Sequence, residues 1–327
     1  MEENKTLLDV KDLNIRFKTK KGYVNAVEHL NFSMNKGEML ALVGESGCGK
    51  SVTSLAVMGL IEKPGEVQAE EIVINGVDMT KLPAKEIRKL RGTEMAMIFQ
   101  DPLTSLNPLF TVGNQISEQF MTHIPGCTKE QAKELSIDMI RKTGIPRPEE
   151  VFKSYPHELS GGMRQRVMIA IALACNPKLL IADEPTTALD VTIQAQILHL
   201  MKNLIKEYET AILFITHDLG VVAEMADRVV VMYTGQIVEE ADVNTIFHNP
   251  KHPYTQGLLH STIKVQDKRG HLDPIEGTVP SLNKLPEGCR FHPRCKYATE
   301  ECRKRMPELI EVEPGHYSRC LMAEKGE

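Results

Sequence analysis

Short apolar runs recur along the chain, and each ends at a glycine or a polar residue. They are "MLALVG" (39–44), "MAMIFQ" (95–100), "KLLIAD" (178–183), "TAILFIT" (210–216) and "RVVVMY" (228–233). Runs of this length that are apolar at successive positions are typical of strands buried on both faces. The pattern therefore predicts a set of buried strands.

Segments with apolar residues at helical spacing separate these runs, for example "KSVTSLAVMGLI" and "TIQAQILHLMKNLIKEY". Strands that alternate with helices indicate an α/β fold with a mainly parallel sheet. Residues from about 101 to 175 carry helix-like segments and few strand signals, which predicts a helical insertion. After about 245 the chain becomes rich in proline and histidine, so we expect one domain over 1–245 and a C-terminal extension over 246–327.

Composition limits the possible classes of protein. A hydrophobic content of 42% and a charged content of 25% are ordinary for a soluble globular protein, and a formal net charge of -5 gives no reason to expect nucleic-acid binding. The N-terminal "MEENKTLL" does not resemble a signal peptide, and no apolar run reaches the ~20 residues that span a bilayer. We expect a cytosolic protein that can dock on a membrane protein, where clustered cysteines favour metal binding or catalysis over disulfides.

A phosphate-binding loop follows the first predicted strand. "GESGCGKS" (44–51) matches G-x-x-x-x-G-K-[ST] between a strand and a helix, which is the context that this motif requires. Its backbone N–H groups would hold phosphate oxygens, Lys50 would reach the β- and γ-phosphates, and the Ser51 hydroxyl would bind Mg²⁺. The residues expected to line the nucleotide are Gly44, Ser46, Gly47, Cys48, Gly49, Lys50, Ser51 and Val52. The side chain of Cys48 is given no role of its own.

Two adjacent acids, Asp183 and Glu184, end the apolar run "LLIADEP". Unpaired buried charge is costly, so two acids at the end of a buried strand need a partner. A hydrated Mg²⁺ held by Asp183 would supply one. Glu184 would then polarise the attacking water as a general base.

The segment "LSGGMRQR" (159–166) narrows the family. Ser160, Gly161 and Gly162 precede a helical pattern and so predict a second helix N-terminus suited to an anion. With the motifs above, the chain resembles the ATP-binding cassette (ABC) ATPases over about residues 5–245. That resemblance implies a P-loop ABC-type nucleotide-binding domain with a mainly parallel core, an N-terminal antiparallel β subdomain and a helical insertion. Two such cassettes pair head to tail, with each ATP between one phosphate loop and the partner's signature.

The resemblance assigns further positions. Gln100 in "IFQDP" matches the glutamine that senses Mg²⁺ and water, Asp190 in "TALD" matches the D-loop aspartate, and His217 in "ITHD" matches the switch histidine. It implies a catalytic set and a magnesium set, and adds the signature and the D-loop to the nucleotide contacts. The catalytic set is Lys50, Gln100, Glu184 and His217; the magnesium set is Ser51, Gln100 and Asp183; the added contacts are Ser160, Gly161, Gly162 and Asp190.

Two positions of the cassette are less well defined by the pattern. Phe17 fits the aromatic that stacks on adenine best by spacing, and Tyr23 is the alternative. Met163 stands where the family signature has glutamine, and methionine cannot donate the amide hydrogen bonds. The contacts at that corner of the site are therefore expected to differ, without loss of activity.

The tail resembles a particular group of ABC ATPases. "NPKHPYTQGLL" (249–259) and "GTVPSLNKLPEGCRFHPRCKYA" (277–298) are similar to the C-terminal extension of dipeptide and oligopeptide permease ATP-binding subunits. This implies an ATPase that powers import of dipeptides or oligopeptides, peripheral to the cell membrane on its cytoplasmic side. Its implied partners are a sister ATPase subunit, two membrane permease subunits and an external peptide-binding protein. Val52 and Met163 resemble the first of the two sister subunits.

Alternatives of other kinds stay open. Nickel importers of the same group carry this extension, so nickel is a possible cargo. A soluble ABC ATPase acting on DNA or ribosomes is disfavoured because the chain has one cassette and no long heptad run. A non-enzymatic regulator with an inactive cassette is disfavoured because Lys50, Asp183, Glu184 and His217 are all present.

Four of the seven cysteines lie near the end of the chain, at Cys289, Cys295, Cys302 and Cys320. They are separated by five, six and seventeen residues and lack the short C-x₂-C spacing usual for zinc. Four thiolates also suit a [4Fe–4S] cluster, and the resembling subunits include cluster-bearing examples. We therefore expect a structural or redox-sensing [4Fe–4S] site, with Zn²⁺, disulfides or free thiols as alternatives. Four nearby arginines would offset the charge of such a cluster: Arg290, Arg294, Arg303 and Arg305.

Overall fold

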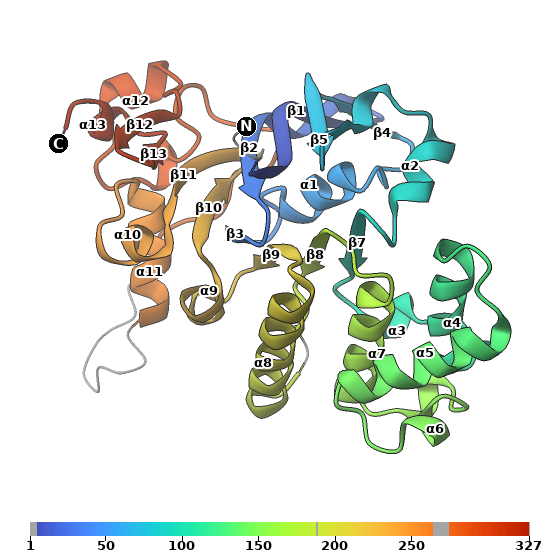
Figure 1. The fold of residues 1–327 in the computed structure, drawn as a ribbon. Coiled ribbons are helices and arrows are strands. Elements are labelled where there is room, and N and C mark those ends of the chain that lie inside the picture. Colours follow the sequence, from blue (N-terminus) through green and yellow to red (C-terminus); the bar gives the residue numbers. More distant parts are fainter. Residues whose placement is uncertain (1–4, 188, 264–274, 327) are drawn as a thin grey trace. The chain divides into compact units, whose positions relative to one another are not determined.

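The computed structural model describes residues 5–187, 189–263 and 275–326. The chain forms two compact units, each made of three segments of the sequence. Figure 1 labels the helices and strands and colours the ribbon from the N-terminus in blue to the C-terminus in red. The first contains residues 5–8, Met34–Glu38 and Val73–Leu213, and the second contains Asp9–Ser33, Met39–Ile72 and the described residues from Phe214 onward. Several strands run across these limits: β1 (Thr6–Thr19), β2 (Gly22–Asn35), β5 (Glu71–Ile74) and β9 (Ala211–Thr216).

The first unit combines a parallel strand pair with a group of helices. Strand β7 (Met95–Ile98) pairs in parallel with β8 (Leu179–Asp183), with Met95 opposite Leu179. Helix α7 (Gly161–Leu173) packs against β7 and against several neighbouring helices. The remaining elements of this unit are β6 (Val77–Asp78), α2 (Ala84–Leu90), α3 (Pro102–Ser105), α4 (Val112–His123), α5 (Lys129–Lys142), α6 (Pro148–Val151), α8 (Val191–Tyr208) and the short 3₁₀ helices Met79–Lys81 and Pro156–Glu158.

Side-chain caps fix where the helices of the first unit begin. At α5, Thr128 Oγ1 accepts from Gln131 N–H, and the Gln131 side chain accepts from Thr128 N–H, which forms a capping box. Helix α8 begins after Asp190, whose carboxylate accepts from Ile193 N–H at 3.0 Å. Such caps satisfy backbone donors that have no partner within the helix.

The second unit is built on a sheet to which the C-terminal extension contributes strands. Strand β3 (Met39–Val43) pairs in parallel with β10 (Arg228–Tyr233), and β10 pairs antiparallel with β11 (Gln236–Asp242). Strand β13 (His316–Ser318) then pairs antiparallel with β11 and with β12 (Ile310–Glu313). The other elements are α1 (Lys50–Val57), β4 (Gly65–Gln68), α9 (Leu219–Met225), α10 (Val243–His248), α11 (Pro253–Ile263), the 3₁₀ helix His292–Arg294, α12 (Glu300–Lys304) and α13 (Leu321–Glu324).

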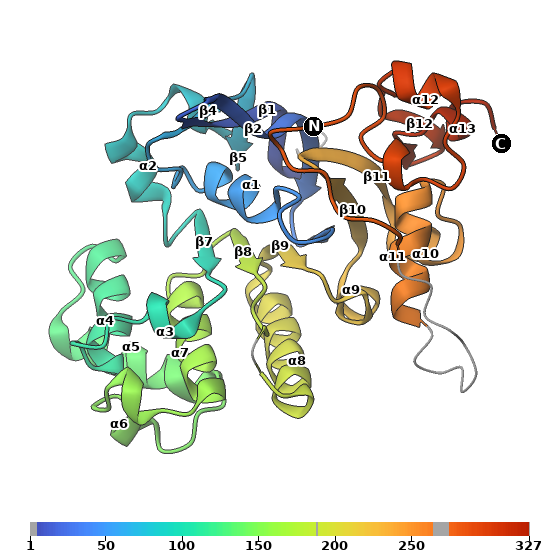
Figure 2. The ribbon, with the colours of Figure 1, turned by 180° about the vertical axis from the view of Figure 1, so that it is seen from behind.

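One apolar core joins the cassette strands of this unit to the extension. Ala41 and Val43 of β3 belong to the same buried cluster as Tyr233, Tyr254 and Phe291. The rings of Tyr233 and Tyr254 have centroids 4.6 Å apart, and Phe291 stands edge-on to Tyr233 at 5.3 Å. Figure 2 shows α10 and α11 close to β10 and β11 from behind. Residues on both sides of position 245 therefore contribute to one packed core.

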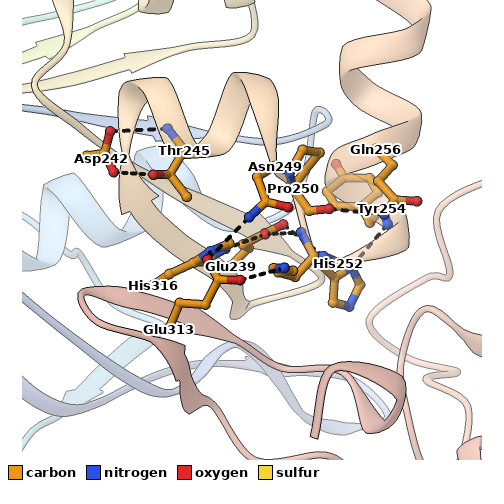
Figure 3. Close-up of polar contacts among 11 residues, drawn as sticks. Glu239, Asp242, Thr245, Asn249, Pro250, His252, Tyr254, Gln256, Glu313 and His316 are labelled. Carbon is orange, nitrogen blue, oxygen red and sulfur yellow. Dashed lines mark hydrogen bonds and ion pairs between the residues drawn. The ribbon is translucent and has the colours of Figure 1, made fainter. Parts of the chain in front are cut away.

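A buried polar network ties the extension to β11 (Figure 3). Glu239 is fully buried, and its carboxylate accepts from the backbone N–H groups of Lys251 and His252. His316 Nε2 lies 2.8 Å from the same carboxylate. Burial lowers the pKa of His252 to about 4, so its neutral ring can accept at Nδ1 from Tyr254 N–H at 3.0 Å. A buried carboxylate is tolerated here because it has several donors.

The predicted fold class is confirmed. All five apolar runs form strands, four of them shorter than the run by one or two residues and β10 at full length, and parallel pairs occur in both units. The N-terminal strands pair antiparallel, with β1 beside β4. The region from 101 to 175 contains helices and no strand among its described residues. Within the described part of the chain, no helix is both long and apolar enough to cross a membrane.

Candidate active site

The phosphate loop lies in the second unit between β3 and α1. Gly44, Gly47 and Gly49 have positive φ angles of 151°, 79° and 111°, which glycine adopts without strain from a Cβ. Helix α1 begins at Lys50 with no side-chain cap, so the N–H groups of its first turn point to the loop. Lys50 is buried, and its Nζ donates to the carbonyls of Gly44 at 2.7 Å and Glu45 at 3.2 Å.

The phosphate loop packs closely against the backbone at Met232 and Gly235. A Cβ on Gly44 would lie 2.3 Å from the Met232 carbonyl oxygen, so no other residue fits without movement. Cys48 is buried under the loop, and its carbonyl accepts from Gly235 N–H at 2.8 Å. Burial raises the pKa of the Cys48 thiol, which keeps it protonated.

The carboxylate pair lies in the first unit at the end of β8. Asp183 is buried, and Glu184 follows it with a positive φ of 47°. The Glu184 Oε2 atom accepts from Gln100 Nε2 at 3.0 Å and from Thr187 Oγ1 at 2.9 Å. Two predicted site residues, Gln100 and Glu184, therefore meet, although they are far apart in sequence. Thr187 was not predicted, although a hydroxyl three residues after Glu184 was a usable signal.

The signature residues 160–162 lie at the N-terminus of helix α7 in the first unit, as predicted. Ser160 precedes α7, and its Oγ accepts from Met163 N–H at 3.3 Å. The Met163 position thus contributes its backbone N–H to the cap, whatever its side chain. A Cβ on Gly162 would lie 2.9 Å from Ile193 Cγ2 of α8, which explains why a small residue stands there. Asp190 serves as the cap of α8, and this does not test its predicted contact with nucleotide.

His217 and the two adenine-stacking candidates lie in the second unit. His217 follows directly after β9 and is exposed. Phe17 is half-buried on β1 opposite Gly65 of β4. Tyr23 is exposed, its ring is covered by the Arg16 guanidinium at 4.5 Å, and its hydroxyl donates to Glu66 at 3.0 Å. Because Tyr23 already stacks on a cation, Phe17 remains the stronger candidate for adenine.

The predicted ATP residues are thus divided between the units. The second unit holds the phosphate loop, Phe17 and His217. The first unit holds Gln100, Asp183, Glu184, Asp190 and the signature residues 160–162.

The four cysteines of the extension line one small cavity in the second unit, with Phe291, His292 and Tyr297 beside them. Cys289 N–H donates to the Cys302 carbonyl at 2.8 Å, which brings those two segments together. Burial raises the pKa of the Cys289 thiol to about 11 and also raises the pKa of Cys295 and Cys320. No group of three or more His, Cys, Asp or Glu side chains among the described residues is placed to hold a single metal ion.

The arginines near these cysteines pair with carboxylates. Arg290 contacts Glu28, and Arg294 binds Glu45 of the phosphate loop at 2.6 Å. Arg303 lies 3.7 Å from Glu300, and Arg305 pairs with Glu301 and Glu324. The sequence predicts that these four arginines offset the charge of a cluster. In the structure each of them pairs with a carboxylate, and the effect on a cluster remains a prediction. No local signal in the sequence indicated that Arg294 and Glu45, 249 positions apart, would meet.

Comparison with known proteins supplies the family. The family model "ABC transporter" matches residues 27–187, and "Oligopeptide/dipeptide transporter, C-terminal region" matches residues 238–302. The chain is 50% identical to the oligopeptide transport ATP-binding protein AppD of Bacillus subtilis, over 98% of each chain. It is 53% identical to the dipeptide transport ATP-binding protein DppD of Haemophilus influenzae, over 94% of this chain and 92% of that one.

Solved structures agree with this similarity. The cassette MJ0796, solved as a dimer in a post-hydrolysis state with ADP and phosphate, matches with a TM-score of 0.65 and 26% identity. The match covers 72% of this chain and 99% of that one. CbiO1 of Clostridium perfringens, part of an ABC transporter complex, matches with a TM-score of 0.63 and 26% identity over 75% of this chain and 92% of that one. The chain therefore belongs to the ABC transporter family, as an ATPase of the oligopeptide and dipeptide transport group.

Proposed function

We propose that this chain hydrolyses ATP to power the import of dipeptides or oligopeptides through a membrane transporter. The observation that carries the proposal is the similarity of 50–53% identity to peptide-transport ATP-binding proteins over nearly the whole chain. That similarity includes the C-terminal extension as well as the cassette.

The chemistry rests on a few side chains. Lys50 would hold the β- and γ-phosphates, and the glycine-rich backbone would supply N–H donors. Glu184 would accept a proton from the attacking water, with its carboxylate oriented by Gln100 and Thr187. His217 would contact the γ-phosphate. Mg²⁺ prefers oxygen ligands, and three side chains would supply them: Ser51, Gln100 and the buried Asp183. When bound, Mg²⁺ would neutralise phosphate charge.

The partners follow from the same proposal. A sister ATPase subunit would pair head to tail with this one, so that Ser160, Gly161 and Gly162 contact the ATP held by the sister. Residues 101–116 after Gln100 would dock on one of two membrane permease subunits. Leu103, Leu109 and Phe110 support this because they are large apolar side chains exposed on that segment. The chain would lie on the cytoplasmic side of the cell membrane, and an external binding protein would deliver the peptide.

An uptake experiment tests the cargo. We expect cells that lack this subunit to lose uptake of a labelled dipeptide, and the wild-type chain to restore it. Restoration by the Lys50→Ala variant would contradict the role of the phosphate loop, since its ammonium is expected to hold ATP. If labelled Ni²⁺ uptake, and not peptide uptake, follows the presence of the subunit, the cargo is nickel and the peptide proposal is wrong.

The four cysteines are further proposed to hold a [4Fe–4S] cluster. Cys289, Cys295, Cys302 and Cys320 line one small cavity. Four thiolates around one cavity can each bind a different iron atom of a cluster, and the sequence spacing lacks the short C-x₂-C pair usual for zinc. The neutral thiols would have to release protons on binding.

Metal analysis decides this proposal. After anaerobic purification we expect about four iron and four sulfide per chain, with visible charge-transfer absorption. Cys302→Ser should lower all three, whereas Cys127→Ser, outside the extension, should leave them unchanged. A colourless chain with one zinc would replace the cluster by zinc. A metal-free chain with four reactive thiols would remove the site altogether.

A further inference from the structure

Every polar group of Glu45, the second residue of the phosphate loop, is bound. Its carbonyl accepts from Lys50 at 3.2 Å, and its N–H donates to the Tyr254 hydroxyl at 2.9 Å. Its carboxylate receives two bonds from Arg294, Nη1 to Oε2 at 2.6 Å and Nη2 to Oε1 at 3.1 Å. Tyr254 and Arg294 both belong to the C-terminal extension. We call these two residues the Glu45 clamp.

The Glu45 clamp is itself held firmly. The Arg294 side chain is only 4% exposed, and it also donates to the carbonyls of Glu276 at 3.0 Å and Ile275 at 3.3 Å. Tyr254 is fully buried, and its ring packs on Tyr233 and Phe291. Because their own contacts already restrict the rotamers of Arg294 and Tyr254, these side chains hold Glu45 in one position at little further entropic cost.

A second contact leads from the same part of the extension to the loop. Arg290 donates to the Thr234 carbonyl and pairs with Glu28. Gly235, which follows Thr234 in the sequence, donates its N–H to the carbonyl of Cys48 in the phosphate loop at 2.8 Å. The segment between Cys289 and Cys295 thus supports the loop through two arginines.

The charge of Glu45 gives the clamp a consequence for ATP. A carboxylate within a loop that binds phosphates repels them, unless an opposite charge offsets it. Arg294 supplies that charge in a bidentate geometry, which lysine cannot reproduce. Without Arg294, the Glu45 carboxylate would stand uncompensated within the phosphate loop, and the residue whose carbonyl binds Lys50 would lose two side-chain hydrogen bonds.

We propose that the C-terminal extension sets the affinity of the phosphate loop for ATP, with Arg294 and Tyr254 as positioning residues that hold and neutralise Glu45. This inference rests on the proposed binding of MgATP at that loop. It gives the extension a role in the nucleotide cycle that does not depend on what the four cysteines bind.

A charge-rescue experiment on the full-length chain tests the proposal. MgATP affinity is measured by titration for wild type, Arg294→Met, Glu45→Gln and the double variant. We expect Arg294→Met to weaken binding about tenfold, as for residues coupled in one network. Glu45→Gln alone should stay within about threefold, and the double variant should recover to a similar level, because the repelling charge is gone. Arg294→Lys should fall between wild type and Arg294→Met.

The controls separate this role from a loss of folding. Arg305→Met removes an exposed arginine of the same extension that pairs with Glu301 and Glu324, and it should not change MgATP affinity. Thermal unfolding of each variant is recorded in parallel. The proposal is overturned if folded Arg294→Met binds like wild type, or if Glu45→Gln fails to rescue it. If the wild-type chain does not bind MgATP, the proposed function fails instead.

Discussion

Replacement of Glu184 by glutamine is expected to lower steady-state ATP hydrolysis by about 100- to 10,000-fold, the usual contribution of a general base. The amide keeps the size of the side chain and can still accept from Gln100 and Thr187, which bond to one oxygen of the carboxylate. It cannot accept a proton from water near neutral pH. MgATP affinity should therefore stay within about threefold of wild type, and phosphate release by the assembled transporter is the measurement.

A matched control for this change exists in the same unit. Glu209 also has a positive φ, 53°, and it is exposed at the end of α8. Glu209→Gln makes the same chemical change at a similar positive φ and should leave hydrolysis within about twofold, as is usual for surface substitutions. Retention of half the wild-type rate by Glu184→Gln would refute its role as the base.

Gly44→Ala is expected to destabilise the second unit by about 3 kcal/mol, at the upper end for overpacking. The added methyl group would stand 2.3 Å from the Met232 carbonyl oxygen and 2.8 Å from Cys48 Sγ, at a φ of 151° that alanine avoids. The carbonyl belongs to β10, which pairs with β3, so the strand cannot move without loss of sheet hydrogen bonds. The midpoint of urea unfolding, measured without nucleotide, reports the loss.

Gly47→Ala provides the comparison within the same loop. Its φ is also positive, 79°, but an added methyl group has no neighbour within 4 Å. Only the backbone strain remains, which costs about 1 kcal/mol. Equal shifts of the two midpoints would mean that the Met232 carbonyl yields readily, and that the contact at Gly44 is unimportant for stability.

Local patterns were enough to place five strands of the cassette, β3, β7, β8, β9 and β10, and the starts of α1 and α7, but not β1, β2, β4, β5, β6 or β11. The phosphate loop was found because its glycines and lysine are contiguous, and α7 because Ser160 directly precedes the apolar pattern that it caps. Four of the five strands are one or two residues shorter than the predicted runs, and the residues left out are mostly glycine or polar ones at the ends. The roles assigned to Gln100 and His217 came from resemblance, whereas that of Asp183 came from the pair of acids at the end of a buried strand. Their contacts with nucleotide or Mg²⁺ remain predictions.

Contacts over long sequence separation could not be predicted in the same way. Arg294 looked like one of several basic residues near the cysteines, and its bond to Glu45 depends on how the extension packs on the sheet. The buried Glu239 with His316 is a similar case, because each residue alone looks like a surface group. Only the completed core around Tyr233 and Phe291 brings such partners together.

The strand β13, which completes the sheet beside β11, has a consequence for protein engineering. A chimera that joins this cassette to the tail of another transporter must reproduce more than a linker sequence. The foreign tail has to supply hydrogen bonds along β11, a histidine for the buried Glu239, and an arginine for Glu45. We therefore expect the cassette and the tail to be exchangeable only as one piece.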